Sequence, residues 1–186
     1  HYLDGVADDT MKAYEGALKA LEGLGAKLSK IRIEGAEAAH RHASVMIYSD
    51  ACALHSERLR SEPGKFGAMT LERLLTGLEL TGVDYARAMR AKESWRRGLR
   101  GVFRTIDILA TPTTLADPPP IEDGQSLLQA TTAYTQTTYA GAFGGLPGLS
   151  IPCGVSRQGM PIGLQLEAAP WQEPLLLRAG HAYQQA

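Results

Sequence analysis

The segment 145–170 limits what this chain can fold into more than any other part of it. Two short apolar runs, 149–151 and 162–166, are separated by a turn rich in glycine and proline. An X-Pro step precedes each run, at Pro147 and at Pro161, and a proline pushes the residue before it towards extended geometry. Apolar runs of this length, bounded by turn residues, are typical of β-strands. We therefore expect two neighbouring strands here.

The motifs around these strands occur in a recognisable order. In chain order they are DILATPTT at 107–114, GLPGLSIPCG at 145–154, GMPIGLQL at 159–166 and an expected helix at 173–185. This order resembles the C-terminal part of the amidase signature family. The resemblance extends through the first half of the chain, where three residues match an Arg, a Gly and a Tyr of such enzymes. They are Arg73, Gly77 and Tyr85.

The spacing of the expected strands predicts the fold class. Strands separated by helical segments are typical of an α/β protein in which helices flank a sheet. The expected strands are 28–33, 108–110, 149–152 and 162–167. The resemblance implies a layered, mixed β-sheet flanked by helices, of which this chain supplies only some strands. We therefore expect an α/β fold that is incomplete without an N-terminal half, with one sheet edge and one apolar face uncovered.

Within this portion of a domain, residues 1–106 are predicted to be mainly helical, and residues 107–186 to be strand-rich with a closing helix. Periodic apolar positions predict helices at 11–24, 36–60, 71–80 and 84–105. The buried stripe of helix 36–60 is predicted to consist of Ala39, Ala43, Met46, Ile47 and Leu54. Residues 111–125, which include three consecutive prolines, are expected to form an ordered loop.

The resemblance implies catalysis by groups outside these residues. Members of the family use a serine nucleophile, a bridging serine and a lysine base, all upstream of the matched part. The chain has no Gly-Gly-Ser-Ser run, its six lysines lie in polar surroundings, and it begins at His1 rather than at Met. We expect a fragment or processed part of an enzyme that hydrolyses amide C–N bonds, with no catalytic residue of its own and inactive by itself.

Several serines and histidines of the chain are candidates for a catalytic or metal-binding role, but the sequence does not favour that role for them. Ser44, Ser150 and Ser156 do not lie on a Gly-x-Ser-x-Gly elbow, and no base can be assigned to them. His40 and His42 are two apart on an expected helix and point to different sides, so they cannot share a metal ion. Because no carboxylate or cysteine lies at metal-ligand spacing from them, both are predicted to be surface histidines. No metal ion or other cofactor is predicted.

By resemblance, the segment 134–145 passes beside the catalytic cleft. The predicted substrate-binding residues are Thr135, Thr138, Tyr139, Ala142 and Arg73. Members that accept glutamine carry an acidic residue near the position of Thr135, so glutamine is disfavoured and a small neutral or anionic amide is preferred. Arg73 is suited to hold a substrate carboxylate, although a structural salt bridge is an equal alternative. Ala142 departs from the family, which commonly has asparagine there.

Composition bounds the partners. The chain is 44% hydrophobic and 21% charged with a net charge of −1, which favours neither nucleic acid nor a membrane as a partner. Seven basic residues on helix 84–105 suit RNA or an acidic subunit, but a solvated face that pairs with acids elsewhere is favoured. These are Arg87, Arg90, Lys92, Arg96, Arg97, Arg100 and Arg104.

The expected partners are the missing N-terminal half and a small amide substrate, and a homo-oligomer is left open. Two cysteines without metal-like spacing, and no signal peptide, suggest a cytoplasmic protein. Two alternatives remain. In the first alternative the chain is a non-catalytic subunit that binds a partner through its open sheet. In the second, which is less favoured, it is a subunit of a tRNA-dependent amidotransferase.

Overall fold

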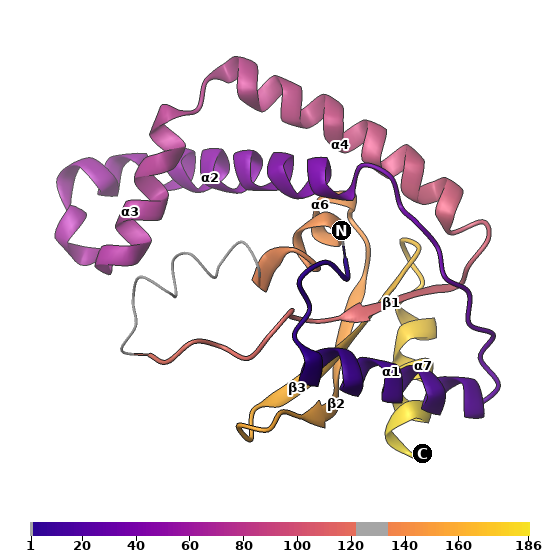
Figure 1. The fold of residues 1–186 in the computed structure, drawn as a ribbon. Helices are drawn as coiled ribbons and strands as arrows, with labels where there is room; N and C mark the ends of the chain where they lie inside the picture. The colour runs from indigo at the N-terminus through magenta and orange to yellow at the C-terminus, as the bar shows by residue number, and fades with distance from the viewer. Residues whose placement is uncertain (1, 122–133) are drawn as a thin grey trace.

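Two long helices lie side by side on one side of a small β-sheet, and two shorter helices pack against its other face (Figure 1). The computed structural model describes residues 2–121 and 134–186. The elements are α1 (Asp8–Gly23), α2 (Ala36–Ser61), η1 (Pro63–Lys65), α3 (Ala68–Thr76), η2 (Gly77–Glu79), α4 (Gly82–Val102), β1 (Ile108–Pro112), α6 (Tyr139–Gly144), β2 (Gly148–Val155), β3 (Pro161–Ala168) and α7 (Glu173–Gln184).

The sheet has the order β1-β3-β2, and both pairings are antiparallel. At the centre of β3, Gln165 faces Thr111 on one side and Ser150 on the other. The β2–β3 register shifts between Pro152 and Gly154. Proline lacks the backbone N–H that a continuous ladder needs, so a bulge at this position is expected.

Alternation along β3 gives the sheet two different faces. Leu164, Leu166 and Ala168 are at most 1% exposed and join a core that α1 and α7 complete. Tyr14 of α1 packs in this core and donates a hydrogen bond from its hydroxyl to the Ala110 carbonyl, at 3.1 Å. The two helices therefore cover the apolar face.

A second core lies between α2, α4 and α6. It contains small residues of α2 together with large residues of the other two helices. The buried indole N–H of Trp95 donates to the Ala140 carbonyl at 2.7 Å, which fixes α6 against α4. Gly144 allows this close approach, because a Cβ there would overlap the Leu99 side chain.

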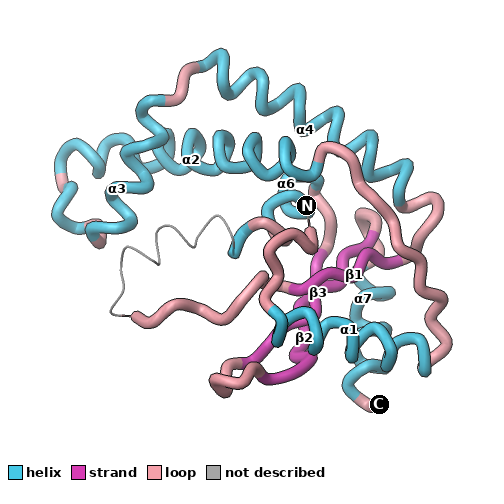
Figure 2. The backbone as a smooth tube through the Cα atoms, in the orientation of Figure 1, coloured by secondary structure: helices cyan, strands magenta, loops and turns pink. Residues whose placement is uncertain are grey.

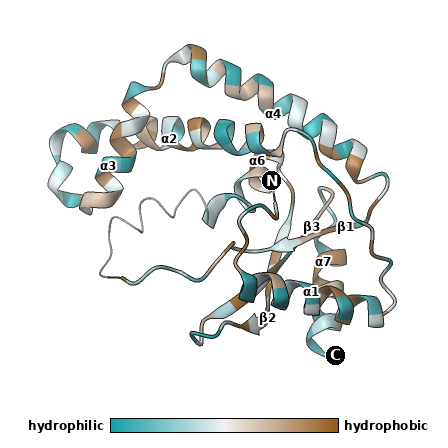
Figure 3. Cartoon of the chain, viewed as in Figure 1, coloured by the Kyte–Doolittle hydropathy of each residue, from teal (hydrophilic) through white to brown (hydrophobic). Residues whose placement is uncertain are grey.

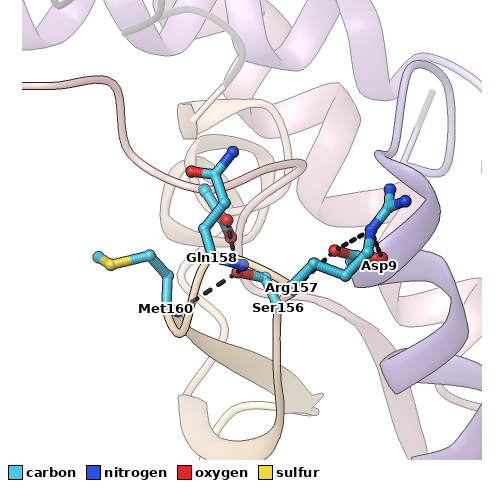
Figure 4. Close-up of polar contacts among 6 residues, drawn as sticks. Asp9, Ser156, Arg157, Gln158 and Met160 are labelled. Carbon is cyan, nitrogen blue, oxygen red and sulfur yellow. Dashed lines mark hydrogen bonds and ion pairs between the residues drawn. The ribbon is translucent and has the colours of Figure 1, made fainter.

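The turn between β2 and β3 is held by polar contacts (Figure 4). Ser156 donates from its hydroxyl to the Asp117 carboxylate at 2.5 Å and accepts from the Gln158 and Met160 N–H groups at 3.3 Å. Asp9 of α1 accepts from the backbone N–H and the side chain of Arg157. These Arg157 hydrogen bonds, first that of the backbone N–H, lower the pKa of the Asp9 carboxyl. The turn is thereby fastened to α1.

The α/β class and the hairpin are confirmed, and the predicted helices form with shifted ends. The prediction of a strand at 28–33 is wrong. These residues are part of a loop between α1 and α2 (Figure 2), and among the described residues no strand pairs with them. Alternating Ile31 and Ile33 gave the period of a strand, but a strand also needs a neighbour to hydrogen bond with. The loop predicted at 111–125 begins after β1, and its part beyond residue 121 lies outside the described residues.

The predicted buried stripe of α2 is only partly right. Ala39 and Ala43 are buried, but Ile47 is 42% exposed and Leu54 is 79% exposed. The residues that α2 buries near its start are instead Ala36, Ala39, His40 and Ala43, at the spacing i, i+3, i+4, i+7. His40 is only 7% exposed, so the prediction that it is a surface histidine is wrong.

Candidate functional site

The face of the sheet opposite α1 and α7 is polar, and it positions the segment that precedes α6. Gln165 is buried and donates from its side-chain amide to the Thr137 carbonyl at 3.0 Å. Thr137 in turn donates from its hydroxyl to the Thr113 carbonyl at 2.6 Å. Because both threonines and Gln165 are held by buried or half-buried groups, residues 134–138 have a defined path across the sheet.

Helix α2 holds the same segment from its other side. The His40 Nε2 atom lies 3.0 Å from the Thr135 hydroxyl oxygen. Burial first, and then the charge of Arg41, lowers the pKa of His40. Thr138 donates from its hydroxyl to the Thr135 carbonyl at 3.4 Å, which closes the turn into α6. A neutral imidazole and two hydroxyls thus line this part of the site.

Two phenols and a guanidinium extend the site along α2. The rings of His40 and Tyr139 lie 5.5 Å apart and are tilted by 53°. Arg73 of α3 donates from Nη2 to the Tyr48 hydroxyl at 3.5 Å. Burial, followed by Tyr48, raises the pKa of Tyr139, while the charge of Arg73 acts to lower it. These side chains therefore form one polar cluster, which we call the α2 cluster: His40, Tyr48, Arg73, Thr135 and Tyr139.

The middle of α6 meets a buried carboxyl group. Glu167, on the polar face of β3, is 3% exposed, and a Cβ on Gly141 would overlap its Oε1 atom. Its Oε2 atom is buried and accepts no hydrogen bond from the residues that the structure describes. Burial raises the pKa of Glu167 to about 7. Ala142 lies on the exposed side of α6 and contributes only its small size.

Three of the predicted substrate-binding residues, Arg73, Thr135 and Tyr139, are brought together in the α2 cluster, and Thr138 is bonded to it. Sequence reasoning missed His40 and Tyr48. For His40 a signal was present, because it follows the small residue Ala36 by four positions on the same helix face. No such spacing singled out Tyr48.

Other kinds of site find no support in the described part of the chain. No three His, Cys, Asp or Glu residues within residues 2–121 and 134–186 lie close enough together to hold a metal ion. None of the described helices is both long and apolar enough to cross a membrane.

Comparison with known proteins identifies the family. The family model described as Amidase matches residues 2–177. An amidase of Pseudomonas putida is 30% identical over 197 residues, which cover 100% of this chain and 41% of that protein. The 1-carboxybiuret hydrolase subunit AtzE of Pseudomonas sp. strain ADP is 34% identical over 155 residues, covering 80% of this chain and 34% of the relative.

A solved structure agrees. An inhibitor-bound vestigial protein complex, described in connection with the origins of an s-triazine catabolic enzyme, contains a chain that matches with a TM-score of 0.86 at 30% identity. The match covers 99% of this chain and 41% of that one. The present chain thus spans between about one third and two fifths of the length of these relatives. Family model, sequence identity and fold agree, and the chain belongs to the amidase family of hydrolases.

Proposed function

We propose that this chain is the C-terminal portion of an amidase whose serine nucleophile and lysine base lie outside these 186 residues. In the intact enzyme a serine attacks the amide carbonyl, the amine leaves, and water releases the acid from the acyl-enzyme. The observation that carries the proposal is the coverage. The whole of this chain matches an amidase, but it accounts for only 41% of that amidase. Its role is to supply sheet strands and one wall of the substrate pocket.

Two of the serines discounted above, Ser150 and Ser156, support this division of roles. The Ser156 hydroxyl is engaged by Asp117 and by two backbone N–H groups, and these fix a turn. The Ser150 and Thr113 hydroxyl oxygens lie 2.6 Å apart on the sheet. Neither serine is hydrogen bonded to a histidine or lysine in the described structure, whereas a serine nucleophile needs a base within hydrogen-bond reach.

The lysines support it too. A lysine base needs a buried, apolar setting that lowers its pKa. Five of the six lysines are exposed and the sixth, Lys92, is half-buried with its ammonium 5.9 Å from the centre of the Phe143 ring. The described structure therefore offers no lysine in such a setting.

The α2 cluster favours an anionic amide as substrate. Arg73 is its cation, and the Tyr48 hydroxyl lies 3.5 Å from Arg73 Nη2, so the two groups are placed to bind a carboxylate together. Thr135 offers a hydroxyl bonded to an uncharged imidazole, so neither group balances the ammonium of a free amino acid such as glutamine. The relative AtzE is named for 1-carboxybiuret, an amide that carries a carboxyl group.

Substrate comparison tests this proposal. The protein encoded from upstream of His1 is assayed with succinamate, with butyramide as a neutral analogue of similar size, and with glutamine. We expect kcat/KM to be highest for succinamate, and Arg73→Leu to reduce it about 100-fold for succinamate but little for butyramide. Arg60→Leu, an exposed arginine of α2, serves as the control. Equal loss on both amides would show that Arg73 has only a structural role.

The alternative of a non-catalytic partner-binding module is favoured by one observation. Strands β1 and β2 are the outer strands of the sheet, and each has one edge that faces no other strand among the described residues. An unpaired edge can accept a further strand from another chain. Light scattering of the chain, alone and mixed with the upstream portion, shows whether the two associate, and an assay of the mixture shows whether amides are hydrolysed. Association without hydrolysis would favour the partner-binding module.

A further inference from the structure

The outward face of α4 carries a regular pattern of arginines that the proposed amidase function does not use. Helix α4 packs on α2 and α6 through Ala88, Trp95 and Leu99. At 100° per residue, Arg90 and Arg97 lie on the opposite side of the helix. Both are exposed, and hydrophilic positions recur along the whole of α4 in Figure 3.

Among the residues that the structure describes, only two arginines of α4 and the turn after it pair with an acid, whereas the sequence favours a face that pairs with acids elsewhere. Arg87 pairs with Asp84 at 3.8 Å, and Arg96 with Glu93 at 3.4 Å. Four further arginines are exposed and form no ion pair within the described residues: Arg90, Arg97, Arg100 and Arg104. Their charges are therefore available to a partner.

The spacing of the pattern places its residues along one side of the helix. Residues that alternate three and four apart are neighbours on a helix surface and form a continuous strip along it. On α4 and the turn after it, this strip consists of Val83, Ala86, Arg90, Glu93, Arg97, Arg100 and Arg104. From Arg90 to Arg104 the strip is about 21 Å long, at 1.5 Å per residue. Val83 is 59% exposed at its start, which gives the strip an apolar end.

The charges on this strip select the kind of partner. Two copies of the strip would place arginine against arginine, so self-association through this face is unfavourable. RNA binders commonly combine basic groups with aromatic platforms, and the strip contains no aromatic residue and includes the acid Glu93. An acidic helix satisfies the arginines with carboxylates, which guanidinium groups bind in bidentate fashion.

We propose that the strip 83–104 is a docking surface for an acidic α-helix of a partner protein. Carboxylates of that helix face Arg90, Arg97, Arg100 and Arg104, an apolar side chain covers Val83, and a neutral or basic side chain faces Glu93. The attraction between the carboxylates and the arginines is electrostatic, so added salt weakens binding of the acidic helix.

A synthetic helix tests the proposal without knowledge of the natural partner. The probe is a fluorescent peptide of about four heptads with glutamates opposite the four arginines, leucines opposite Val83 and Ala86, and a lysine opposite Glu93. A matched peptide has the same composition with its glutamates moved to the other side of the helix. We expect the patterned peptide to bind the chain at least about tenfold more tightly, by fluorescence anisotropy at low salt. Equal binding of the two peptides would overturn the proposal.

Two variants refine the test. The double variant Arg97→Glu/Arg104→Glu is expected to weaken binding of the patterned peptide about tenfold or more, whereas Arg60→Glu on α2 leaves it unchanged. Equal weakening by both would show general charge attraction and would contradict the docking surface. So would tighter binding of a single-stranded RNA than of the patterned peptide, or loss of peptide binding in the protein extended upstream of His1. The comparison of the two peptides on the unmodified chain stands even if the double variant does not fold.

Discussion

His40 and Thr135 are 95 positions apart in the chain, and their side chains meet at 3.0 Å. This contact joins the start of α2 to the segment that leads into α6. On the other side of that segment, Gln165 holds the Thr137 carbonyl from the sheet. The pocket wall proposed for this chain is therefore fixed between a helix and a sheet, and its geometry depends on both.

Replacing His40 tests this connection. At pH 8 we expect His40→Leu to lower the free energy of unfolding by about 1 kcal/mol, through loss of the hydrogen bond to Thr135. The native pKa of His40 lies below its ordinary value of 6.5, so the unfolded chain takes up a proton first as the pH falls. Stability of the natural chain should therefore decrease below about pH 6.5, and less so in the variant. Urea unfolding from pH 5 to 8 measures this, with the exposed His181→Leu as control.

The Glu167 carboxyl gives the opposite pH dependence. Its pKa rises from 4.5 to about 7 on folding, so the folded chain keeps the proton that the unfolded chain has lost. This contribution to stability is complete below pH 4.5 and is lost as the pH rises through about 7, a change of roughly 3 kcal/mol. Glu167→Gln should match the natural chain at pH 5 and exceed it by that order at pH 8. Equal stability at both pH values would show that the carboxyl ionises freely; the exposed Glu173→Gln is the control.

Gly141 is required where α6 approaches the sheet. Its Cβ would overlap a carboxylate oxygen that is buried and has little room to move, so we expect Gly141→Ala to destabilise the chain by about 1–3 kcal/mol. Gly98→Ala on α4 meets open space and should stabilise it by about 0.5–1 kcal/mol. Thermal unfolding of the two variants compares them directly. A similar Tm for both would mean that Glu167 moves aside without cost.

Trp95 anchors α6 through its indole N–H. Trp95→Phe keeps most of the apolar volume but leaves the Ala140 carbonyl, a buried acceptor, without this donor. We expect a loss of about 1–3 kcal/mol in urea unfolding. Trp171→Phe, at a residue that is 87% exposed, should change stability little. Equal effects would indicate that the indole N–H contributes nothing to the packing of α6.

The sequence supports some of these features better than others. The hairpin of β2 and β3 was predictable, because proline and glycine mark both strands locally. The strand predicted at 28–33 was wrong, since alternation alone does not reveal whether a neighbouring strand exists. The prediction of a surface position for His40 considered only whether it could bind a metal ion, although His40 lies between Ala39 and Ala43 on the buried face of α2.

The candidate site shows the same limit. Arg73 and Tyr139 came from family resemblance, but their link through Tyr48 and His40 depends on how α2, α3 and α6 pack. The burial of Glu167 could not be predicted from the sequence, because an acidic residue after the apolar run of β3 indicates the end of the buried strand. Its burial follows from Gly141, which lets α6 cover it.

Hydrolysis of succinamate by two proteins, the 186-residue chain and the protein encoded from upstream of His1, is the most direct test of the central claim. The claim is that this chain shapes an amidase pocket whose reacting groups lie elsewhere. It predicts turnover by the longer protein only, abolished by a serine-directed inhibitor. Turnover by the 186-residue chain alone, sensitive to the same inhibitor, would contradict it.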